Sequence, residues 1–564
     1  MKLKFLPGML ALVSYFVTSL HAAEPARERL FNDAWRFVRG EVDGGDKADC
    51  KDDTWRKLSL PHDWSIESDF SEEFASCTGY LPGGIGWYRK HFTLPESSAG
   101  KRVYVRFEGV YRNSDVWLNG QHLGSRPSGY TDFEYDLTSH LLPAGGENVI
   151  AVKVAREQVA DSRCYPGTGI YRDVWLTMVD PVHVARHGTF LTTPVVTDEE
   201  AMVNSVCEVA NDSNKESEVT VTARVCDAEG HTVSSASSKQ VLAAGASWNF
   251  PLFHPVEKPQ RWSHEDPYLY QVIHRVEVAG RVVDEVTTSL GIRTIRFDAN
   301  HGFFLNEKPV LIKGVCNHHD AGNLGAVMPR AVLERRLRIL KDIGVNAIRC
   351  SHNPMQDDLY DLCDRMGLLV MDEAFDEWEM GKRKWVKGRN VGTATRFGYN
   401  EAFKAWAVPD VEAMVWGRPT RSAWRRCWTS RAITIRKPPM TRTTLHSREE
   451  SSSAVKMATR WPPGMRSLTS HLSAASISGQ VSISSARPIA GRRTAATRGC
   501  SIPQASSNRS DSSARRYGLL APCSIWRFIT RICAIPGFIG TKSRMKTRLS
   551  RWWPIAIYRR SPLN

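Results

Sequence analysis

Two kinds of hydrophobic spacing divide the first 415 residues of the chain. Up to about residue 296, short runs alternate polar and apolar side chains, which is the spacing of strands that bury one face. Residues 101–107, 148–154 and 219–225 show this alternation. Farther along, apolar residues recur at helical spacing between short apolar runs. The order therefore predicts β domains followed by alternating strands and helices.

The β-rich half is expected to form two sandwiches. Many short strands separated by turns, without a helical period, favour this architecture. Within residues 115–121, Asn119-Gly120 is typical of a type I′ hairpin turn. We expect a jelly-roll β-sandwich over residues 24–180 and a smaller immunoglobulin-like β-sandwich over residues 181–296.

The next stretch, residues 297–415, predicts parallel strand–helix units. Pro329 is placed to open a helix that Gly344 ends, and Gly367 is placed to end a second helix. The expected strands are residues 310–313, 346–349 and 368–371. Strand–helix repeats with short loops form either a (β/α) barrel or a doubly wound sheet.

The first 23 residues have the order of a secretory signal peptide. Lys2 and Lys4 precede an apolar run over residues 5–20, and small residues suited to cleavage follow at 21–23. A buried N-terminal strand is the alternative interpretation. The run is too short and too interrupted for a membrane helix. We therefore expect a secreted or periplasmic protein with no membrane span.

Cysteine spacing indicates little about redox chemistry. The 12 cysteines are scattered and form no Cys-x-x-Cys pair. In an exported protein Cys50 and Cys77 are the candidate disulfide of the first domain, and the others are expected to be small buried apolar residues or accidents of the tail.

Charge separates the last 148 residues from everything before them. Residues 417–564 contain 28 Lys and Arg against 3 Asp and Glu, whereas the preceding residues contain 47 basic and 57 acidic side chains. The overall net charge of +15 is therefore a property of the tail. Arg and Trp together could bind nucleic acid, but the predicted export argues against a nucleic-acid partner.

Several motifs in the β-rich half resemble one family of enzymes. Residues 86–90 (Gly-Trp-Tyr-Arg-Lys), 115–120 and 169–174 (Gly-Ile-Tyr-Arg-Asp-Val) resemble the N-terminal sandwich of glycoside hydrolase family 2. The spacing is more similar to the β-galactosidases than to the β-glucuronidases of that family. Cys164 departs from the pattern, because relatives commonly carry Trp there.

The strand–helix region continues the resemblance in the same order. Residues 313–320 (Lys-Gly-Val-Cys-Asn-His-His-Asp), 349–354 (Arg-Cys-Ser-His-Asn-Pro) and 371–376 (Met-Asp-Glu-Ala-Phe-Asp) resemble the ends of the first three strands of the family's (β/α)8 barrel. The resemblance implies a retaining β-glycosidase that acts on β-linked glycosides or oligosaccharides. It also implies a divalent cation in intact relatives, although the matching ligands would lie beyond these motifs.

The same resemblance assigns a sugar pocket to the carboxyl ends of these strands, where barrel enzymes place their sites. The candidate sugar-contacting residues are His318, His319, Asp320, Arg349, His352, Asn353, Asp372, Glu373 and Trp378.

Each candidate also has an alternative role. His352 could be a structural loop residue, Asp320 could cap the next segment, and the two acids after the third strand could make buried hydrogen bonds. Asn113 or Arg163 of the first sandwich could also reach a sugar. Two tryptophans of that sandwich are assigned to its core rather than to a ligand platform. These are Trp87 and Trp117.

Both catalytic carboxylates of a retaining glycosidase are missing from the sequence. Such enzymes need an acid/base and a nucleophile about 5–5.5 Å apart, and in the family the acid/base follows an Asn after the fourth strand. The pattern breaks at Trp416-Gly417, and no Asn-Glu pair follows. The later acids, Glu449, Glu450 and Asp511, follow no apolar strand. The chain as written is therefore predicted to be inactive or severely impaired.

A shift of reading frame explains the tail. Residues 475–488, back-translated with synonymous codons and read one frame over, can give GQYIWTGVDFLGEA, which resembles a later barrel segment of the same family. We therefore expect residues 416–564 to be an out-of-frame, disordered tail without native-like pattern. The competing function is a non-catalytic carbohydrate-binding protein. The sequence does not predict the oligomeric state.

Overall fold

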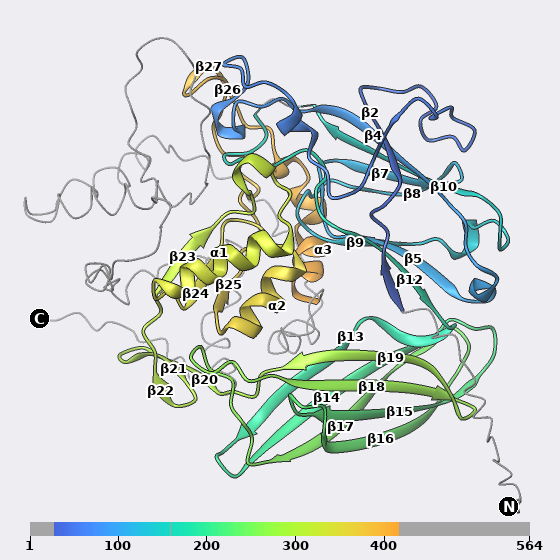
Figure 1. Cartoon of the computed structure of the whole chain (residues 1–564), viewed down its shortest axis with the longest axis vertical. Helices are drawn as coiled ribbons and strands as arrows, with labels where there is room; N and C mark the ends of the chain where they lie inside the picture. The colour runs from blue at the N-terminus through green and yellow to red at the C-terminus, as the bar shows by residue number, and fades with distance from the viewer. Residues whose placement is uncertain (1–26, 158–159, 417–564) are drawn as a thin grey trace, which may run out of the picture.

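Two β-sandwiches and a strand–helix layer follow one another along the chain (Figure 1). The computed structural model describes residues 27–157 and 160–416, so the predicted signal peptide and most of the basic tail lie outside the described residues. The predicted order of β domains before strand–helix units is confirmed. Among the described residues, no helix is long and apolar enough to cross a membrane.

The first sandwich pairs a six-stranded sheet with a four-stranded sheet. The first sheet has the order β3 (Arg56–Leu58), β2 (Trp35–Arg39), β4 (Gly84–Phe92), β10 (Asn148–Arg156), β7 (Ser114–Leu118) and β8 (Gln121–Arg126). The second has the order β1 (Glu28–Leu30), β12 (Val174–Val179), β5 (Arg102–Phe107) and β9 (Phe133–Asp136). A short pair, β6 (Val110–Tyr111) and β11 (Gly169–Ile170), lies beside them.

Alternation in the sequence becomes burial in this sandwich. In β5, Val103, Val105 and Phe107 enter the core while their neighbours stay partly exposed. Asn119 and Gly120 both have positive φ, 52° and 83°, as a type I′ turn requires, and they connect β7 to β8.

One prediction for this domain is confirmed in part and one is wrong. Trp87 is buried, as predicted, whereas Trp117 is only half-buried and stacks on it with ring centroids 5.4 Å apart. The loop at Gly45 covers Trp87, since an added Cβ there would lie 2.9 Å from the indole. Cys50 and Cys77 are both free thiols, so they form no disulfide.

The second sandwich packs a three-stranded sheet against a four-stranded sheet. The first has the order β13 (Val182–Val196), β14 (Glu200–Asn211) and β17 (Ser247–Glu257). The second has the order β16 (Thr232–Leu242), β15 (Ser217–Cys226), β18 (Tyr270–Val278) and β19 (Arg281–Leu290). Two buried histidines, His254 on β17 and His274 on β18, lie among the apolar residues of its interior.

The strand–helix layer begins after a small antiparallel sheet. That sheet contains β20 (Ile295–Asp298), β21 (Gly302–Leu305) and β22 (Lys308–Pro309). A parallel sheet follows, with the order β23 (Gly314–Asn317), β24 (Ala347–Cys350) and β25 (Leu369–Met371). Its helices are α1 (Arg330–Asp342) and α2 (Asp357–Met366).

Local signals placed these helices correctly but misplaced the first strand. Pro329 precedes α1, and Gly367 ends α2 in the left-handed conformation. The strand expected at residues 310–313 is wrong, because β24 pairs with Gly314–Asn317 instead. Three parallel strands are part of a barrel rather than a closed one.

Two further elements connect this layer to the first sandwich. The hairpin of β26 (Lys384–Lys387) and β27 (Val391–Thr395) lies near its loops, and α3 (Phe403–Trp416) lies between the two domains (Figure 1). The buried carboxylate of Asp410 in α3 accepts hydrogen bonds from Arg126 Nη2 at 2.6 Å and Thr131 Oγ1 at 3.1 Å. These contacts hold α3 against the sandwich.

Candidate functional site

Parallel pairing brings the ends of β23, β24 and β25 to one edge of the sheet. Cys316 lies beside Arg349, and Arg349 lies beside Met371. His318 follows β23 and Glu373 follows β25, so both lie beyond the carboxyl ends of their strands. This is the edge at which α/β folds assemble ligand sites.

Glu373 is the centre of this edge. Its buried carboxylate accepts one hydrogen bond from Arg349 Nε and another from His352 Nδ1, the latter at 2.8 Å. A carboxylate only accepts, so His352 Nδ1 is the donor of this hydrogen bond. Arg349 Nη1 also donates to Cys316 Sγ at 3.3 Å. Glu373 therefore fixes both partners.

The imidazole of His318 stands edge-on to that of His352, with ring centroids 5.3 Å apart. Burial, with a smaller contribution from His352, lowers the pKa of His318 to about 4. Its Nδ1 atom is buried and has no hydrogen-bond partner among the described residues. A neutral imidazole with an unused nitrogen can exchange a hydrogen bond with a sugar hydroxyl.

Three of the predicted residues use their polar groups within the protein. His319 is buried, donates from Nε2 to Pro166 O at 3.2 Å, and has a pKa that burial lowers to about 3. The carbonyl of Asp320 accepts from Arg336, and burial raises the pKa of the Asp320 carboxyl. Asp372 accepts from the hydroxyl of Tyr360 at 2.9 Å. These contacts position the strand ends.

Asn353 and Trp378 are the remaining predicted residues, and one is buried while the other is exposed. Asn353 Oδ1 accepts from the backbone of Asp376, while its buried Nδ2 has no partner among the described residues. Trp378 is 42% exposed and packs edge-on against Phe375 at 5.6 Å. Its exposed ring is therefore available at the surface.

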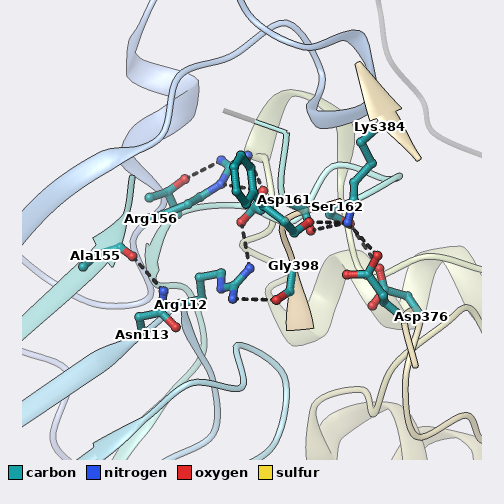
Figure 2. Close-up of polar contacts among 12 residues, drawn as sticks. Arg112, Asn113, Ala155, Arg156, Asp161, Ser162, Asp376, Lys384 and Gly398 are labelled. Atoms are coloured by element: carbon teal, nitrogen blue, oxygen red, sulfur yellow. Dashed lines mark hydrogen bonds and ion pairs between the residues drawn. The ribbon is translucent and has the colours of Figure 1, made fainter. Parts of the chain in front are cut away.

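The first sandwich contributes residues that the sequence motifs did not indicate. Asp161 is buried, and its Oδ1 accepts two bonds of 3.3 Å from Arg156, while its Oδ2 lies 3.7 Å from Arg112 Nη1 (Figure 2). Asp376 of the β25 loop faces this group and accepts from Ser162 Oγ at 3.2 Å. Burial raises the pKa of Asp376.

Whether Asn113 or Arg163 of the first sandwich reaches a sugar stays a prediction. Asn113 donates its amide to Ala155 O at 3.2 Å, within its own sandwich (Figure 2). Arg163 is exposed. Their near neighbours Arg112 and Asp161 contact the segment after the barrel strands, through Gly398 O and Lys384 Nζ respectively.

A buried ion pair closes the far side of this region. Lys384 Nζ lies 2.7 Å from Glu377 Oε1, with side chains only 1% and 2% exposed. The same ammonium donates to the carbonyls of Asp161, at 3.4 Å, and Phe397. It thus ties the β26 hairpin to the site loop of the first sandwich. Gly398 must stay small, because an added Cβ would lie 1.8 Å from Glu377.

The described residues were also compared with the arrangement that a metal site requires. Within residues 27–157 and 160–416, no group of three or more His, Cys, Asp or Glu is arranged to hold an ion.

Comparison with known families agrees with the order of the three domains. A family model described as the sugar binding domain of glycosyl hydrolases family 2 matches residues 72–180. A second family 2 model matches residues 182–293, and the TIM barrel domain of the same family matches residues 298–394. Together they cover more than half of the chain.

Curated relatives belong to two kinds of β-glycosidase. The chain is 45% identical over 400 residues to the β-galactosidase BoGH2A of Bacteroides ovatus, covering 71% of this chain and 46% of that protein. It is 32% identical over 370 residues to a β-glucuronidase of Bacteroides fragilis, covering 64% and 50%. The chain thus spans about half the length of these relatives.

Solved structures of family 2 members and of a β-glucuronidase are also similar to this chain. A glycosyl hydrolase family 2 member from Bacteroides cellulosilyticus superposes with a TM-score of 0.66 at 39% identity, covering 70% of this chain and 50% of that one. The β-glucuronidase 2 of Bacteroides uniformis, bound to cyclophellitol-6-carboxylate aziridine, gives 0.61 at 27% identity, covering 70% and 46%. Since three family 2 models match in domain order and a β-galactosidase is 45% identical over 71% of this chain, this chain belongs to glycoside hydrolase family 2 and is β-galactosidase-like.

Proposed function

We propose that the intact form of this polypeptide is a retaining β-glycosidase that acts on terminal β-galactosides or related β-glycosides. The observation that supports it best is the cluster of Arg349, His352 and Glu373 beyond the parallel strands, with His318 beside it. These hydrogen-bonding groups lie together beyond the carboxyl ends of the parallel strands, where barrel enzymes bind their substrates. The identity to a β-galactosidase over 71% of the chain supports the same substrate class.

We further propose that the chain as written is inactive or severely impaired. A retaining mechanism needs one carboxyl to protonate the leaving oxygen and a second to attack the anomeric carbon. The carboxylates at the described strand ends are already committed, Glu373 to two cationic or hydrogen-bonding partners and Asp372 to Tyr360. The sequence after α3 supplies no carboxylate that follows an apolar strand.

A shift of reading frame after residue 416 accounts for this loss. Relatives extend about twice as far as the matched region, and residues 475–488 can be re-read as a barrel-like segment. Sequencing the gene around codon 416 tests this directly. Restoring the frame should yield a chain that continues through the missing strands, and finding no open alternative frame there would remove the explanation.

Turnover of a nitrophenyl β-galactoside tests the activity. The purified chain should show no hydrolysis above a heat-denatured control, because it lacks nucleophile and proton donor together. The frame-restored protein, purified in the same way, should hydrolyse the substrate. Substantial turnover by the chain as written would contradict the proposed inactivity, and none by the restored protein would contradict the glycosidase.

We also propose export through the N-terminal 23 residues. The charged, apolar and small-residue order of this segment supports the proposal. The N-terminal sequence of protein recovered outside the cytoplasm should begin at Glu24, and intact protein retained in the cytoplasm would contradict export.

A further inference from the structure

A small cavity lies where the loop after β23, the helix α1 and the start of α2 meet the first sandwich. Its polar lining includes Arg172 from the sandwich, Asn317 and His318 from the end of β23, Arg336 from α1, and Gln356 before α2. We call it the arginine cavity. It has room for about one water-sized particle, so a sugar ring cannot enter it.

The two arginines of this cavity have no negatively charged partner within the described residues. Arg172 is 4% exposed and donates only to backbone carbonyls, with the shortest bond, 2.8 Å, to Pro354 O. Arg336 also donates only to carbonyls, those of His318 at 3.2 Å and Asp320 at 2.7 Å. A buried charge costs free energy unless an opposite charge compensates it. Two such guanidiniums around one space therefore indicate a missing anion.

The carboxyl of Asp320 does not supply that charge. Asp320 contacts Arg336 through its backbone carbonyl rather than through its carboxylate. Burial lowers the pKa of Arg336, and the opposing effect of Asp320 is the smaller one. Burial also raises the pKa of the Asp320 carboxyl, which disfavours its charged form. The guanidinium of Arg336 is therefore left largely uncompensated.

Two further polar atoms of the lining residues have no partner among the described residues. Asn317 is 5% exposed and leaves its Nδ2 unbonded, and His318 leaves its buried Nδ1 unbonded. An amide NH2 and a guanidinium only donate, and a neutral imidazole can carry its proton on Nδ1. A water molecule in the cavity would also have to donate its own hydrogens, whereas an anion only accepts. Donors on every polar side of the space thus favour an anion over water.

We propose that the arginine cavity binds a small monovalent anion of the size of chloride, which compensates Arg172 and Arg336 and accepts from Asn317. Chloride is only slightly larger than water, so it suits a cavity of this size. Bound there, the anion would link α1 and the end of β23 to the first sandwich. The site is formed entirely by residues before 417 and requires no catalysis, so it does not rest on the proposed function.

Thermal unfolding of the purified full chain tests the site. Potassium gluconate is replaced stepwise by potassium chloride at constant ionic strength, because gluconate is too large for the cavity. A particle that binds only the folded state raises its stability, so chloride should raise the melting temperature saturably by about 2–4 °C. No chloride-dependent rise would overturn the anion site and would leave at most a water in the cavity.

Asn317→Asp places a carboxylate beside the two arginines in nearly the same volume. It should abolish the response to chloride and raise the melting temperature in gluconate, because the new charge takes the place of the anion. Asn249→Asp adds the same charge at an exposed position of the second sandwich and should keep the response. An equal response in both variants would overturn the proposal.

A second pair of variants decides the matter if Asn317→Asp does not fold. Arg336→Gln removes one of the two charges and should raise the chloride concentration that gives half of the effect at least about tenfold. Arg338→Gln, at an exposed position of the same helix, should leave that concentration unchanged. The same half-effect concentration in both variants would also overturn the site.

Discussion

His352 donates from Nδ1 to the buried carboxylate of Glu373 at 2.8 Å, which connects the loop after β24 to the loop after β25. Arg349 shares the same carboxylate. Glu373 thus holds two candidate sugar-binding residues across neighbouring strands.

Glu373→Ala should destabilise the barrel strands. Removing the carboxylate leaves the charge of Arg349 and the proton of His352 without their acceptor, at a cost of about 1–3 kcal/mol, less than for a fully buried pair because Arg349 is 32% exposed. Urea unfolding should show the loss. Glu334→Ala, which breaks an exposed helical pair with Arg338, should change stability by less than about 0.5 kcal/mol. Equal effects would contradict this role.

Lys384→Met should cost about 3 kcal/mol or more, because it leaves Glu377 buried without its cation. The double variant Lys384→Met with Glu377→Leu should recover much of that loss, since no unpaired charge remains. A double-mutant cycle in urea measures both effects. A double variant as unstable as the sum of the single variants would show that the two side chains do not act as a pair.

Asp63 connects the first sandwich to the barrel strands. It accepts from Ser65 N and Thr168 N in the first sandwich, and from Ala326 N after β23, the last at 2.9 Å. Asp63→Ala would leave these buried donors unbonded, so we expect a loss of about 3 kcal/mol and earlier proteolysis between the domains. Asp53→Ala, at an exposed position, is the control and should do neither. Unchanged proteolysis in Asp63→Ala would argue against the connection.

Acid should weaken the second sandwich. Burial lowers the pKa of both His254 and His274 to about 4, against about 6.5 in the unfolded chain. The unfolded state therefore binds more protons between these values, and stability should fall as the pH drops from about 6.5 to about 4. Above that range the full stability is present. Melting temperatures measured across this range will show the slope.

His274→Leu should flatten this pH dependence. Both ring nitrogens of His274 are buried without partners among the described residues, so an apolar side chain of similar size loses no hydrogen bond. His231→Leu, at an exposed position, is the control and should keep the slope. An unchanged slope in His274→Leu would show that other groups cause it.

Local periodicity predicted the elements that depend on local spacing. The alternation predicted for residues 101–107 reappears as burial in β5, and the helix placed after Pro329 buries Leu333, Leu337 and Leu340. The run at residues 310–313 misled, because an apolar segment carries no information about which residues a parallel neighbour will pair with. Periodicity therefore cannot show whether residues 310–313 or residues 314–317 form the strand that pairs with β24.

In the candidate site, too, the residues set by local sequence could be predicted and those brought together by domain packing could not. Motif positions located Glu373 and His352, since these follow strands directly. The pocket between the first sandwich and the barrel strands could not be predicted, because Tyr130 and Asn353 are distant in sequence and line it only after the domains pack. An unsatisfied buried atom is visible only once its surroundings are known.

The strand β25 pairs with β24 on one side, and within the described residues it has no partner on the other. An open edge of this kind exposes backbone groups that can recruit other chains. Quality control in the cell removes polypeptides that spend time partly open. The open edge of β25 therefore bears first on the steady-state concentration of the protein in the cell.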